Sequence, residues 1–157
     1  MGKIQDYKIA TLGSHSSLQI LKGARDEGFK NLIICEKGRA KPYESFRIAD
    51  EIVEVDSFLD ITKLEDRMIK ENVILVPHGS FFSAYTDLAA LNASKALYFG
   101  NKHILPWEES RDDQRQWLKK AGLKLPKIYK KPEDIDGPVI IKFYGPQGGK
   151  GYFLAKN

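Results

Sequence analysis

The sequence predicts an α/β fold built on a parallel sheet. Short apolar runs recur along the first part of the chain, and each is followed by turn residues and then by a longer amphipathic stretch. This alternation is typical of parallel strands joined by helical crossovers. The 157 residues suit a single domain that buries roughly 70% of its unfolded surface. Hydrophobic residues make up 42% of the chain and charged residues 29%, which argues against disorder or a fibrous repeat.

The strands expected in the first part of the chain predict a Rossmann-like sheet over residues 1–100. The first strand leads through a serine-rich turn into a helix from Ser17 to Glu27, which serines can cap and which ends at Gly28. A second helix is expected from Ser57 to Glu71, after a polar segment over residues 37–50. The expected strands are Lys8–Leu12, Asn31–Cys35, Glu51–Val55, Val73–Val76 and Ala96–Phe99.

The pattern changes beyond residue 100. Residues 101–125 are interpreted as a connection, with a helix from Pro106 to Gly122 whose tryptophans, Trp107 and Trp117, are expected to pack in the core. Residues 126–157 form the third segment, which is expected to close on a hairpin around a glycine-rich loop. Its expected elements are a short strand at Lys127–Tyr129, one helical turn at Pro132–Ile135, and strands at Pro138–Phe143 and Tyr152–Ala155.

Composition and patterning limit the classes of partner and the cellular location that we expect for the protein. The 25 basic and 21 acidic residues are interspersed, so no stripe for nucleic acid is expected. The single cysteine, Cys35, lies in an apolar run and is interpreted as a buried strand thiol and not a nucleophile. No apolar stretch reaches the roughly 20 residues of a membrane span, and no apolar signal region begins the chain, so we expect a cytoplasmic protein without a membrane partner.

A phosphate-binding loop is predicted near the end of the sequence. Residues 145–151 place four glycines and one lysine between two expected strands. Glycines let consecutive backbone N–H groups converge on an anion, and lysine adds a mobile positive charge. Lys142, on the apolar strand before the loop, strengthens this interpretation, while a flexible hairpin turn is the alternative. The candidate loop residues are Gly145, Gly148, Gly149, Lys150 and Gly151.

A second candidate site lies where the first and fourth expected strands end. Gly13, Ser14 and His15 form the first strand–helix turn, and Ser80 lies in the turn after the fourth strand. Ligands collect at this edge of open α/β sheets, where helix N–H groups attract anions. Serines that only cap helices are the alternative. His103 is expected to be merely exposed, and the histidines and cysteine show no metal-ligand spacing.

Taken in order, these motifs resemble a known family. Residues 10–17, 76–81, 99–101, 139–143 and 148–153 are similar to the archaeal formate-dependent ligases of purine biosynthesis that act on 5-aminoimidazole-4-carboxamide ribonucleotide (AICAR). These ligases are ATP-grasp enzymes. The resemblance extends from about residue 8 to the end and implies a Rossmann-like pre-ATP-grasp domain followed by the beginning of an ATP-grasp domain.

The resemblance also implies a reaction and residue roles. ATP phosphorylates formate, and the exocyclic amine of AICAR attacks the resulting formyl phosphate to give the formylated ribonucleotide, ADP and phosphate. His15 and Ser80, with Gly13 and Ser14, would hold the AICAR 5′-phosphate. Lys142 is the implied catalytic contact to the ATP phosphates, and the glycine-rich loop would close over them.

One departure from the family concerns length. The family's chain is about twice as long, as is typical of two-domain enzymes. The adenine pocket and the carboxylates that bind Mg²⁺ are therefore expected outside this sequence. A truncated chain, a partner that supplies the remainder, and a loss of catalysis all stay open. So do another ATP-grasp carboxylate-amine ligase, a non-catalytic module that binds a phosphorylated metabolite, and a homo-oligomer.

Overall fold

The structure, a computed structural model, describes residues 6–78, 82, 84–142 and 152–155. The chain divides into two compact units, residues 1–106 and residues 107–157, called here the amino-terminal and carboxyl-terminal units. The domain boundaries expected at residues 100 and 125 stay a prediction. Within the described residues, no helix combines the length and the apolar character needed to cross a bilayer.

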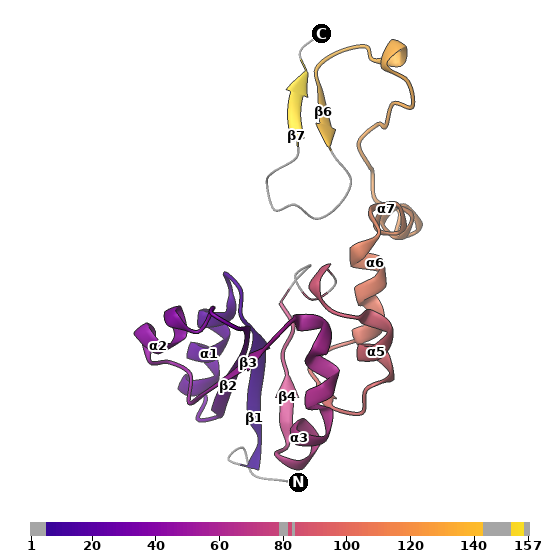
Figure 1. Ribbon diagram of the computed structural model, residues 1–157. Helices are drawn as coiled ribbons and strands as arrows, with labels where there is room; N and C mark the ends of the chain where they lie inside the picture. The colour runs from indigo at the N-terminus through magenta and orange to yellow at the C-terminus, as the bar shows by residue number, and fades with distance from the viewer. Residues whose placement is uncertain (1–5, 79–81, 83, 143–151, 156–157) are drawn as a thin grey trace. The chain divides into compact units, whose positions relative to one another are not determined.

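The amino-terminal unit is built on a five-stranded parallel sheet of order β3-β2-β1-β4-β5 (Figure 1). The chain adds β2 and β3 on one side of β1 and then returns to add β4 and β5 on the other, so the direction of winding reverses between β1 and β4. The predicted α/β class with a Rossmann-like parallel sheet is confirmed. The strands are β1 (Lys8–Leu12), β2 (Lys30–Glu36), β3 (Glu51–Val55), β4 (Val73–Leu75) and β5 (Leu97–Tyr98).

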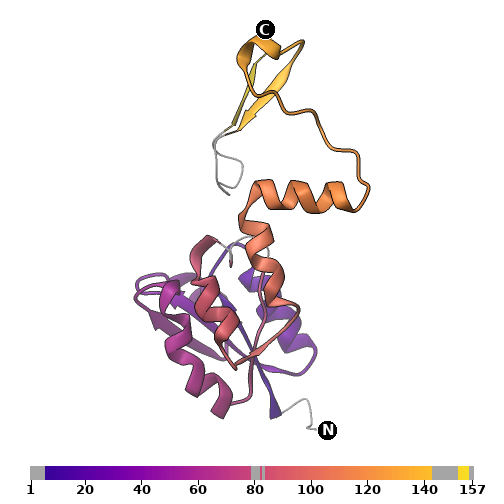
Figure 2. The same ribbon diagram turned by 90° about the vertical axis from the view of Figure 1, so that its right-hand side faces the viewer.

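Helices cover both faces of this sheet (Figures 1 and 2). Alternate residues of β2 point to opposite faces: Leu32 and Ile34 join the larger core cluster, and Ile33 and Cys35 join the smaller one. The larger cluster is closed by η2, α3, α5 and α6, and the smaller by α1 and α2. The burial of Cys35 was predicted correctly. The helical elements are α1 (Ser17–Asp26), α2 (Lys41–Phe46), η2 (Phe58–Leu64), α3 (Glu65–Lys70), α5 (Leu88–Ala93), η3 (Lys102–Ile104) and α6 (Leu105–Glu109).

Two helical elements differ from the expectation. Helix α2 lies in the segment interpreted only as polar, and it buries a single side chain, Tyr43, so it lacks the apolar repeat that marks a helix in sequence. The helix expected from Ser57 to Glu71 begins as a 3₁₀ helix, η2, and becomes α-helical only at Glu65. The Ser57 side chain caps η2 by accepting a hydrogen bond from Leu59 N at 3.2 Å.

The carboxyl-terminal unit contains α7 (Arg111–Lys120), η4 (Pro132–Asp134), β6 (Val139–Lys142) and β7 (Tyr152–Ala155). Strands β6 and β7 form the predicted antiparallel hairpin. The connecting helix is instead two helices, because Ser110 caps α7 by accepting from Asp113 N at 3.2 Å.

Two expectations for the carboxyl-terminal unit are wrong. Lys127–Tyr129 forms no strand, since Lys127 and the Tyr129 hydroxyl both bind the Asp136 carboxylate and close a loop. Trp107 and Trp117 are 39% and 46% exposed, so they do not pack in a core.

Candidate functional site

The candidate site lies at the carboxyl ends of β1 and β4, where the winding of the sheet reverses. Such reversal points are where open α/β sheets bind ligands. The two strand ends are joined by hydrogen bonds: Val76 N donates to Ala10 O at 2.8 Å, and Thr11 Oγ1 donates to Val76 O at 2.8 Å. The turns that follow the two strands therefore meet at one edge, as the sequence predicted.

Gly13 begins the β1–α1 turn in a position that only glycine fits. Its N–H donates to Ile34 O at 2.7 Å, which holds the turn against β2. A Cβ on Gly13 would lie 2.9 Å from the Tyr43 hydroxyl oxygen and 3.0 Å from Cys35 Cβ. Close approach of these two side chains, and not an unusual φ, is the reason for glycine here.

Three side chains fix the remainder of the turn from inside. Ser17 is fully buried, and its Oγ donates to Ser14 O at 2.6 Å and accepts from Ser14 N at 3.2 Å. The Tyr43 hydroxyl lies 3.0 Å from Ser17 Oγ and donates to it, because the Ser17 proton is already engaged. Ser14 Oγ accepts from Ser16 N at 3.2 Å. Ser16 is the N-cap residue of α1, but its side chain makes no capping hydrogen bond. The serine that accepts a hydrogen bond from the backbone at the start of the helix is therefore Ser14.

His78, which follows β4, binds to the same turn. Its Nε2 lies 3.0 Å from Leu12 O, and Ser14 Oγ lies 3.2 Å from Nδ1 and 3.0 Å from Nε2. A carbonyl only accepts, so Nε2 carries the proton that binds Leu12 O. Ser14 Oγ lies at similar distances from both ring nitrogens and therefore contacts the ring without pointing at one of them. The His78 ring also packs edge-on against buried Phe82, with ring centroids 5.5 Å apart.

Burial and neighbouring groups shift the pKa of His78. Burial lowers the pKa from the ordinary 6.5, and the hydrogen bonds to Leu12 O and to the backbone of His78 itself oppose this. The charge of His15, across the turn, lowers the pKa further. His78 is therefore neutral at pH 7, while His15 is exposed to solvent.

The structure brings together part of the predicted phosphate site. Gly13, Ser14 and His15 lie in one turn beside His78, while Ser80 falls outside the described residues. His103 is exposed, as expected. Sequence reasoning placed Ser17 in the first turn and His78 in the second, over residues 77–80, as parts of possible anion-holding loops, but gave neither a role of its own, and it did not consider Tyr43. The position of His78 directly after a predicted strand end was the available signal for it, whereas the Tyr43 contact required the unpredicted helix α2.

The predicted ATP-binding residues lie in the carboxyl-terminal unit. Lys142 ends β6, is exposed, and pairs in register with Tyr152 of β7. Gly145, Gly148, Gly149, Lys150 and Gly151 fall outside the described residues. No group of three acidic, histidine or cysteine side chains suited to a metal ion occurs among the residues that the structure describes.

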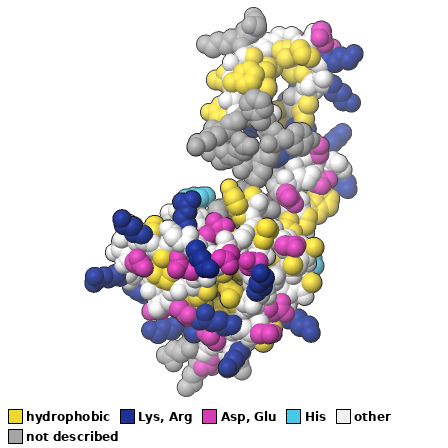
Figure 3. Space-filling view, viewed as in Figure 1, with side chains coloured by type: hydrophobic (Ala, Val, Ile, Leu, Met, Phe, Trp, Pro, Cys, Tyr) yellow, Lys and Arg dark blue, Asp and Glu magenta, His cyan; other side chains and the backbone are white. Residues whose placement is uncertain are grey.

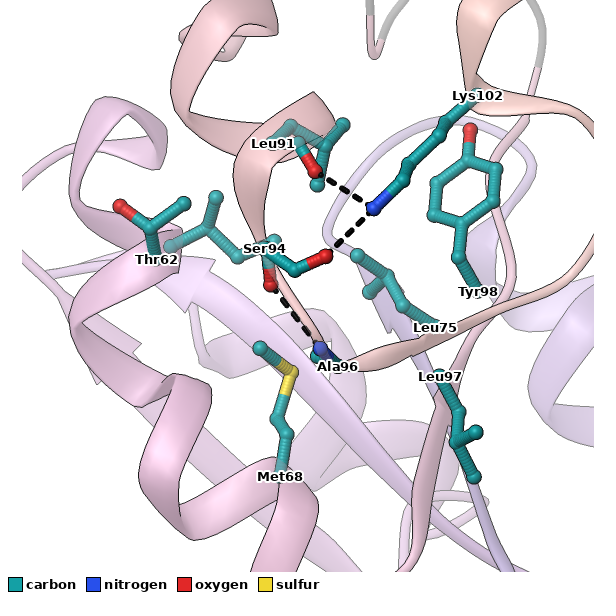
Figure 4. Close-up of a pocket in the computed structure, with 10 residues that line it drawn as sticks. Thr62, Met68, Leu75, Leu91, Ser94, Ala96, Leu97, Tyr98 and Lys102 are labelled. Carbon is teal, nitrogen blue, oxygen red and sulfur yellow. Dashed lines mark hydrogen bonds between the residues drawn. The ribbon is translucent and has the colours of Figure 1, made fainter.

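A cavity elsewhere in the amino-terminal unit is too small for a substrate. It lies beside β5 and has a volume of about 10 Å³, which is room for one water (Figure 4). Lys102 Nζ closes it by donating to Leu91 O at 3.1 Å and to Ser94 O at 2.6 Å at the end of α5. This lysine is therefore a helix cap.

The fold and the strand-end turns are those of a known protein family. A family model described as "Protein of unknown function (DUF1246)" matches residues 9–129, and the chain belongs to this family.

Curated relatives carry a more specific name. The chain is 47% identical over 157 residues to the 5-formaminoimidazole-4-carboxamide-1-(beta)-D-ribofuranosyl 5′-monophosphate synthetase of Methanopyrus kandleri. It is 49% identical over 155 residues to the synthetase of the same name from Methanocaldococcus jannaschii. These matches cover 98% and 97% of the chain but 44% and 43% of the relatives, so the chain spans less than half of their length.

Solved structures agree on the fold. The IMP biosynthesis protein PurP from Thermococcus kodakaraensis superposes with a TM-score of 0.69 at 31% identity, over 95% of this chain and 50% of that one. An N5-carboxyaminoimidazole ribonucleotide synthetase solved with ADP has a TM-score of 0.74 at 15% identity, over 99% and 42%, and this likeness shows the fold alone. The predicted fold, an amino-terminal domain of the ATP-grasp type, is confirmed. The relatives and neighbours are ligases of this type.

Proposed function

We propose that this chain carries the AICAR-binding part of an ATP- and formate-dependent ligase that formylates AICAR in purine biosynthesis. The observation that carries the proposal is the meeting of the β1–α1 turn with His78 at the reversal point of the sheet. The names of the relatives contain a ribofuranosyl 5′-monophosphate, which supports a ligand with a phosphate group. Such an enzyme works on soluble phosphorylated substrates, so we infer a cytoplasmic location.

The phosphate of AICAR fits the β1–α1 turn on chemical grounds. The start of α1 presents backbone N–H groups to the sheet edge, where the helix dipole favours an anion. Exposed His15 adds a side chain whose ring N–H can donate a hydrogen bond to the phosphate. In the proposed complex, Ser14, His15 and Ser80 hold the phosphate beside Gly13, whose own N–H stays bonded to Ile34 O.

The ATP side of the reaction is assigned to the hairpin. Lys142 is exposed at the end of β6, so its ammonium group is available to a triphosphate without a burial cost. Neighbours solved with ADP and with MgADP support ATP and Mg²⁺ as the nucleotide and metal of such an enzyme. When bound, they supply the phosphoryl group and neutralise its charge. We assign the Mg²⁺ ligands and the adenine pocket to the part of the relatives that this chain does not span.

The test is a melting-temperature shift with AICAR, measured on the intact chain and two histidine variants. A ligand that binds only the folded state at 100 times its Kd stabilises the protein by about 2.7 kcal/mol. We expect AICAR to raise the melting temperature of the wild type, and His15→Ala to remove most of that rise. His103→Ala is the matched control, because His103 is also exposed but lies at a different part of the unit. An equal rise in all three proteins, or none in the wild type, would contradict the proposal.

A second candidate is an ATP-grasp ligase that acts on a different imidazole ribonucleotide. The shared fold with the N5-carboxyaminoimidazole ribonucleotide synthetases favours it. The two candidates differ in the base that is recognised and not in the phosphate. Comparing the melting shifts produced by AICAR and by the analogue without the carboxamide separates them: AICAR should give the larger shift if the first candidate is correct.

A further inference from the structure

An exposed phenylalanine follows β5 at the same end of the sheet as the candidate site. Phe99 is 68% exposed, although its backbone is bound to the sheet: Phe99 N donates to Leu75 O at 2.9 Å, which continues the pairing of β4 with β5. Gly100 then turns the chain with a φ of +99°, a conformation that favours glycine. Asn101 caps η3, since its Oδ1 accepts from His103 N at 3.1 Å. The backbone around Phe99 is thus fixed, while most of its ring is open to solvent.

The register of the strands places Phe99 on the face of the sheet that α1 covers. Tyr98 packs against the larger core cluster, on the opposite face, as does its register partner Leu75. Side chains alternate along a strand, so Leu97 points to the face of α1 and the smaller cluster, and Phe99 directly after the strand continues this alternation. Leu97 is itself 44% exposed, so this part of the face is only partly covered.

The distance from Phe99 to the β1–α1 turn suits the length of a ribonucleotide monophosphate. Strand β4 lies between β1 and β5, and the three strands end at one edge. Neighbouring strands are about 4.8 Å apart, so Phe99 lies roughly 10 Å across the sheet from the end of β1. A phosphate bound at residues 13–15, with its ribose passing over the end of β4, brings the base to the Phe99 ring.

We propose that Phe99 is a specificity-determining residue that stacks its ring on the imidazole base of the ribonucleotide. The inference rests on the proposed function, because it requires that the β1–α1 turn bind the phosphate. A single exposed apolar side chain is common on protein surfaces, so the position of Phe99 at the ligand edge, and not its exposure alone, supports this role. A planar heterocycle offers the ring a flat apolar surface, and covering both removes apolar area from water.

The test compares two ligands that share the phosphate and differ in the base, AICAR and ribose 5-phosphate, by isothermal titration calorimetry of the intact chain. We expect Phe99→Ala to weaken AICAR binding about tenfold and to leave ribose 5-phosphate binding within about twofold of the wild type. Leu97→Ala is the matched control, because Leu97 is an exposed apolar residue on the same face but further from the edge, and both affinities should stay unchanged. Wild-type affinity for AICAR in Phe99→Ala, or an equal loss for both ligands, would overturn the inference.

Two further variants separate stacking from apolar bulk. Phe99→Tyr keeps the ring and should bind AICAR like the wild type, whereas Phe99→Leu keeps an apolar side chain without a ring and should lose most of the tenfold. Nuclear magnetic resonance gives an independent readout: the imidazole C–H proton of AICAR should shift upfield on binding to Phe99→Tyr and much less on binding to Phe99→Leu. Both variants should melt near the wild-type temperature without ligand, because the side chain is exposed. Equal affinities and equal proton shifts in the two variants would contradict stacking.

The two proposals fail in different ways. If neither AICAR nor ribose 5-phosphate binds to the wild type, the proposed function fails, and the Phe99 inference fails with it. If AICAR binds at residues 13–15 and its affinity is unchanged in Phe99→Ala, only the Phe99 inference is overturned.

Discussion

Strands β2 and β6 have similar sequences but different surroundings. In β2, Leu32, Ile33, Ile34 and Cys35 are 0–3% exposed, whereas in β6, Ile140 and Ile141 are 58% and 36% exposed. Strand β2 has a neighbour on each side and helices on both faces, while β6, within the part of the chain that the structure describes, pairs with β7 alone. An apolar run therefore predicts a strand in both units, but the layers around the strand decide whether its side chains are buried.

The same contrast extends to the whole of each unit. All buried residues in the described part of the chain lie between Ala10 and Leu105. On the face shown in Figure 3, charged side chains of both signs are interspersed over the amino-terminal unit, and apolar side chains are prominent on the carboxyl-terminal unit. A two-stranded hairpin is marginal by itself, so the exposed apolar side chains of β6 and β7 mark a surface suited to a further layer of structure.

The largest effect that tests this comparison is expected from paired isoleucine substitutions. Ile34→Ala removes a fully buried side chain and should lower the free energy of unfolding by about 3 kcal/mol. Ile140→Ala removes a side chain that is 58% exposed and should change it by less than about 0.5 kcal/mol.

Urea unfolding followed by far-ultraviolet circular dichroism is the appropriate measurement. Tryptophan fluorescence is unsuitable, because both tryptophans of the chain, Trp107 and Trp117, lie in the carboxyl-terminal unit. Equal losses for the two variants would show that β6 is as tightly packed as β2 and would break the comparison.

A smaller effect is expected at the candidate site. Gly13→Ala places a Cβ 2.9 Å from the Tyr43 hydroxyl oxygen and should cost about 2 kcal/mol by overpacking. Combining it with Tyr43→Phe should recover part of the loss, since the closest atom is removed while the Cys35 contact at 3.0 Å remains.

The control for this substitution is Gly23→Ala. Gly23 lies inside α1, and a Cβ there meets nothing within 4 Å, so the change should stabilise the unit by about 0.5–1 kcal/mol. Thermal unfolding of these three variants and the wild type gives the comparison, and a loss at Gly23 as large as that at Gly13 would contradict the steric explanation.

The smallest effect is expected from a surface charge cluster at the opposite end of the sheet. Glu71 accepts from Arg67 Nε at 2.9 Å and from Lys8 Nζ at 2.5 Å, and these bonds lower the pKa of Glu71 from 4.5 to about 2. Because the pKa is lower in the folded state, the stabilisation is complete above about pH 4.5 and is lost as the pH falls toward 2.

Glu71→Gln should therefore cost about 1 kcal/mol at pH 7, after allowance for solvent screening, and progressively less below pH 4.5. Asp26→Asn, in an exposed pair with Lys22 on α1, is the control and should cost less than about 0.5 kcal/mol. Urea unfolding between pH 3 and pH 7 provides the measurement. A Glu71→Gln deficit that grows on acidification would contradict the assignment.

The sheet was largely predictable from sequence because each of its strands is a short apolar run followed by turn residues. Lys8–Leu12 and Glu51–Val55 have the predicted bounds, and α1 ends at Asp26, one residue before the predicted Glu27. Gly28, the predicted stop, follows with a φ of +82°. Helix α2 was not predictable, since it buries one side chain and shows no repeat. The strand expected at Lys127–Tyr129 does not form, because the Lys127 ammonium group and the Tyr129 hydroxyl bind the Asp136 carboxylate. No local sequence pattern shows this contact.

The turns that form the site could be predicted from the sequence, but the hydrogen bonds between their side chains could not. The meeting of the turns after β1 and β4 follows from the parallel topology. The bonds that fix these turns come from side chains distant in sequence: Tyr43 lies 26 residues from Ser17, and His78 lies 64 residues from Ser14. Only the packed structure shows that Ser14 faces His78.

The central claim is that the β1–α1 turn and the end of β4 form one phosphate-binding edge. Two-dimensional amide spectra of the labelled chain, recorded during an AICAR titration, test it most directly. We expect saturable shifts at residues 13–17, Val76 and His78, which weaken sharply in His15→Ala. Shifts confined to residues 107–157, with residues 13–17 unmoved, would contradict it.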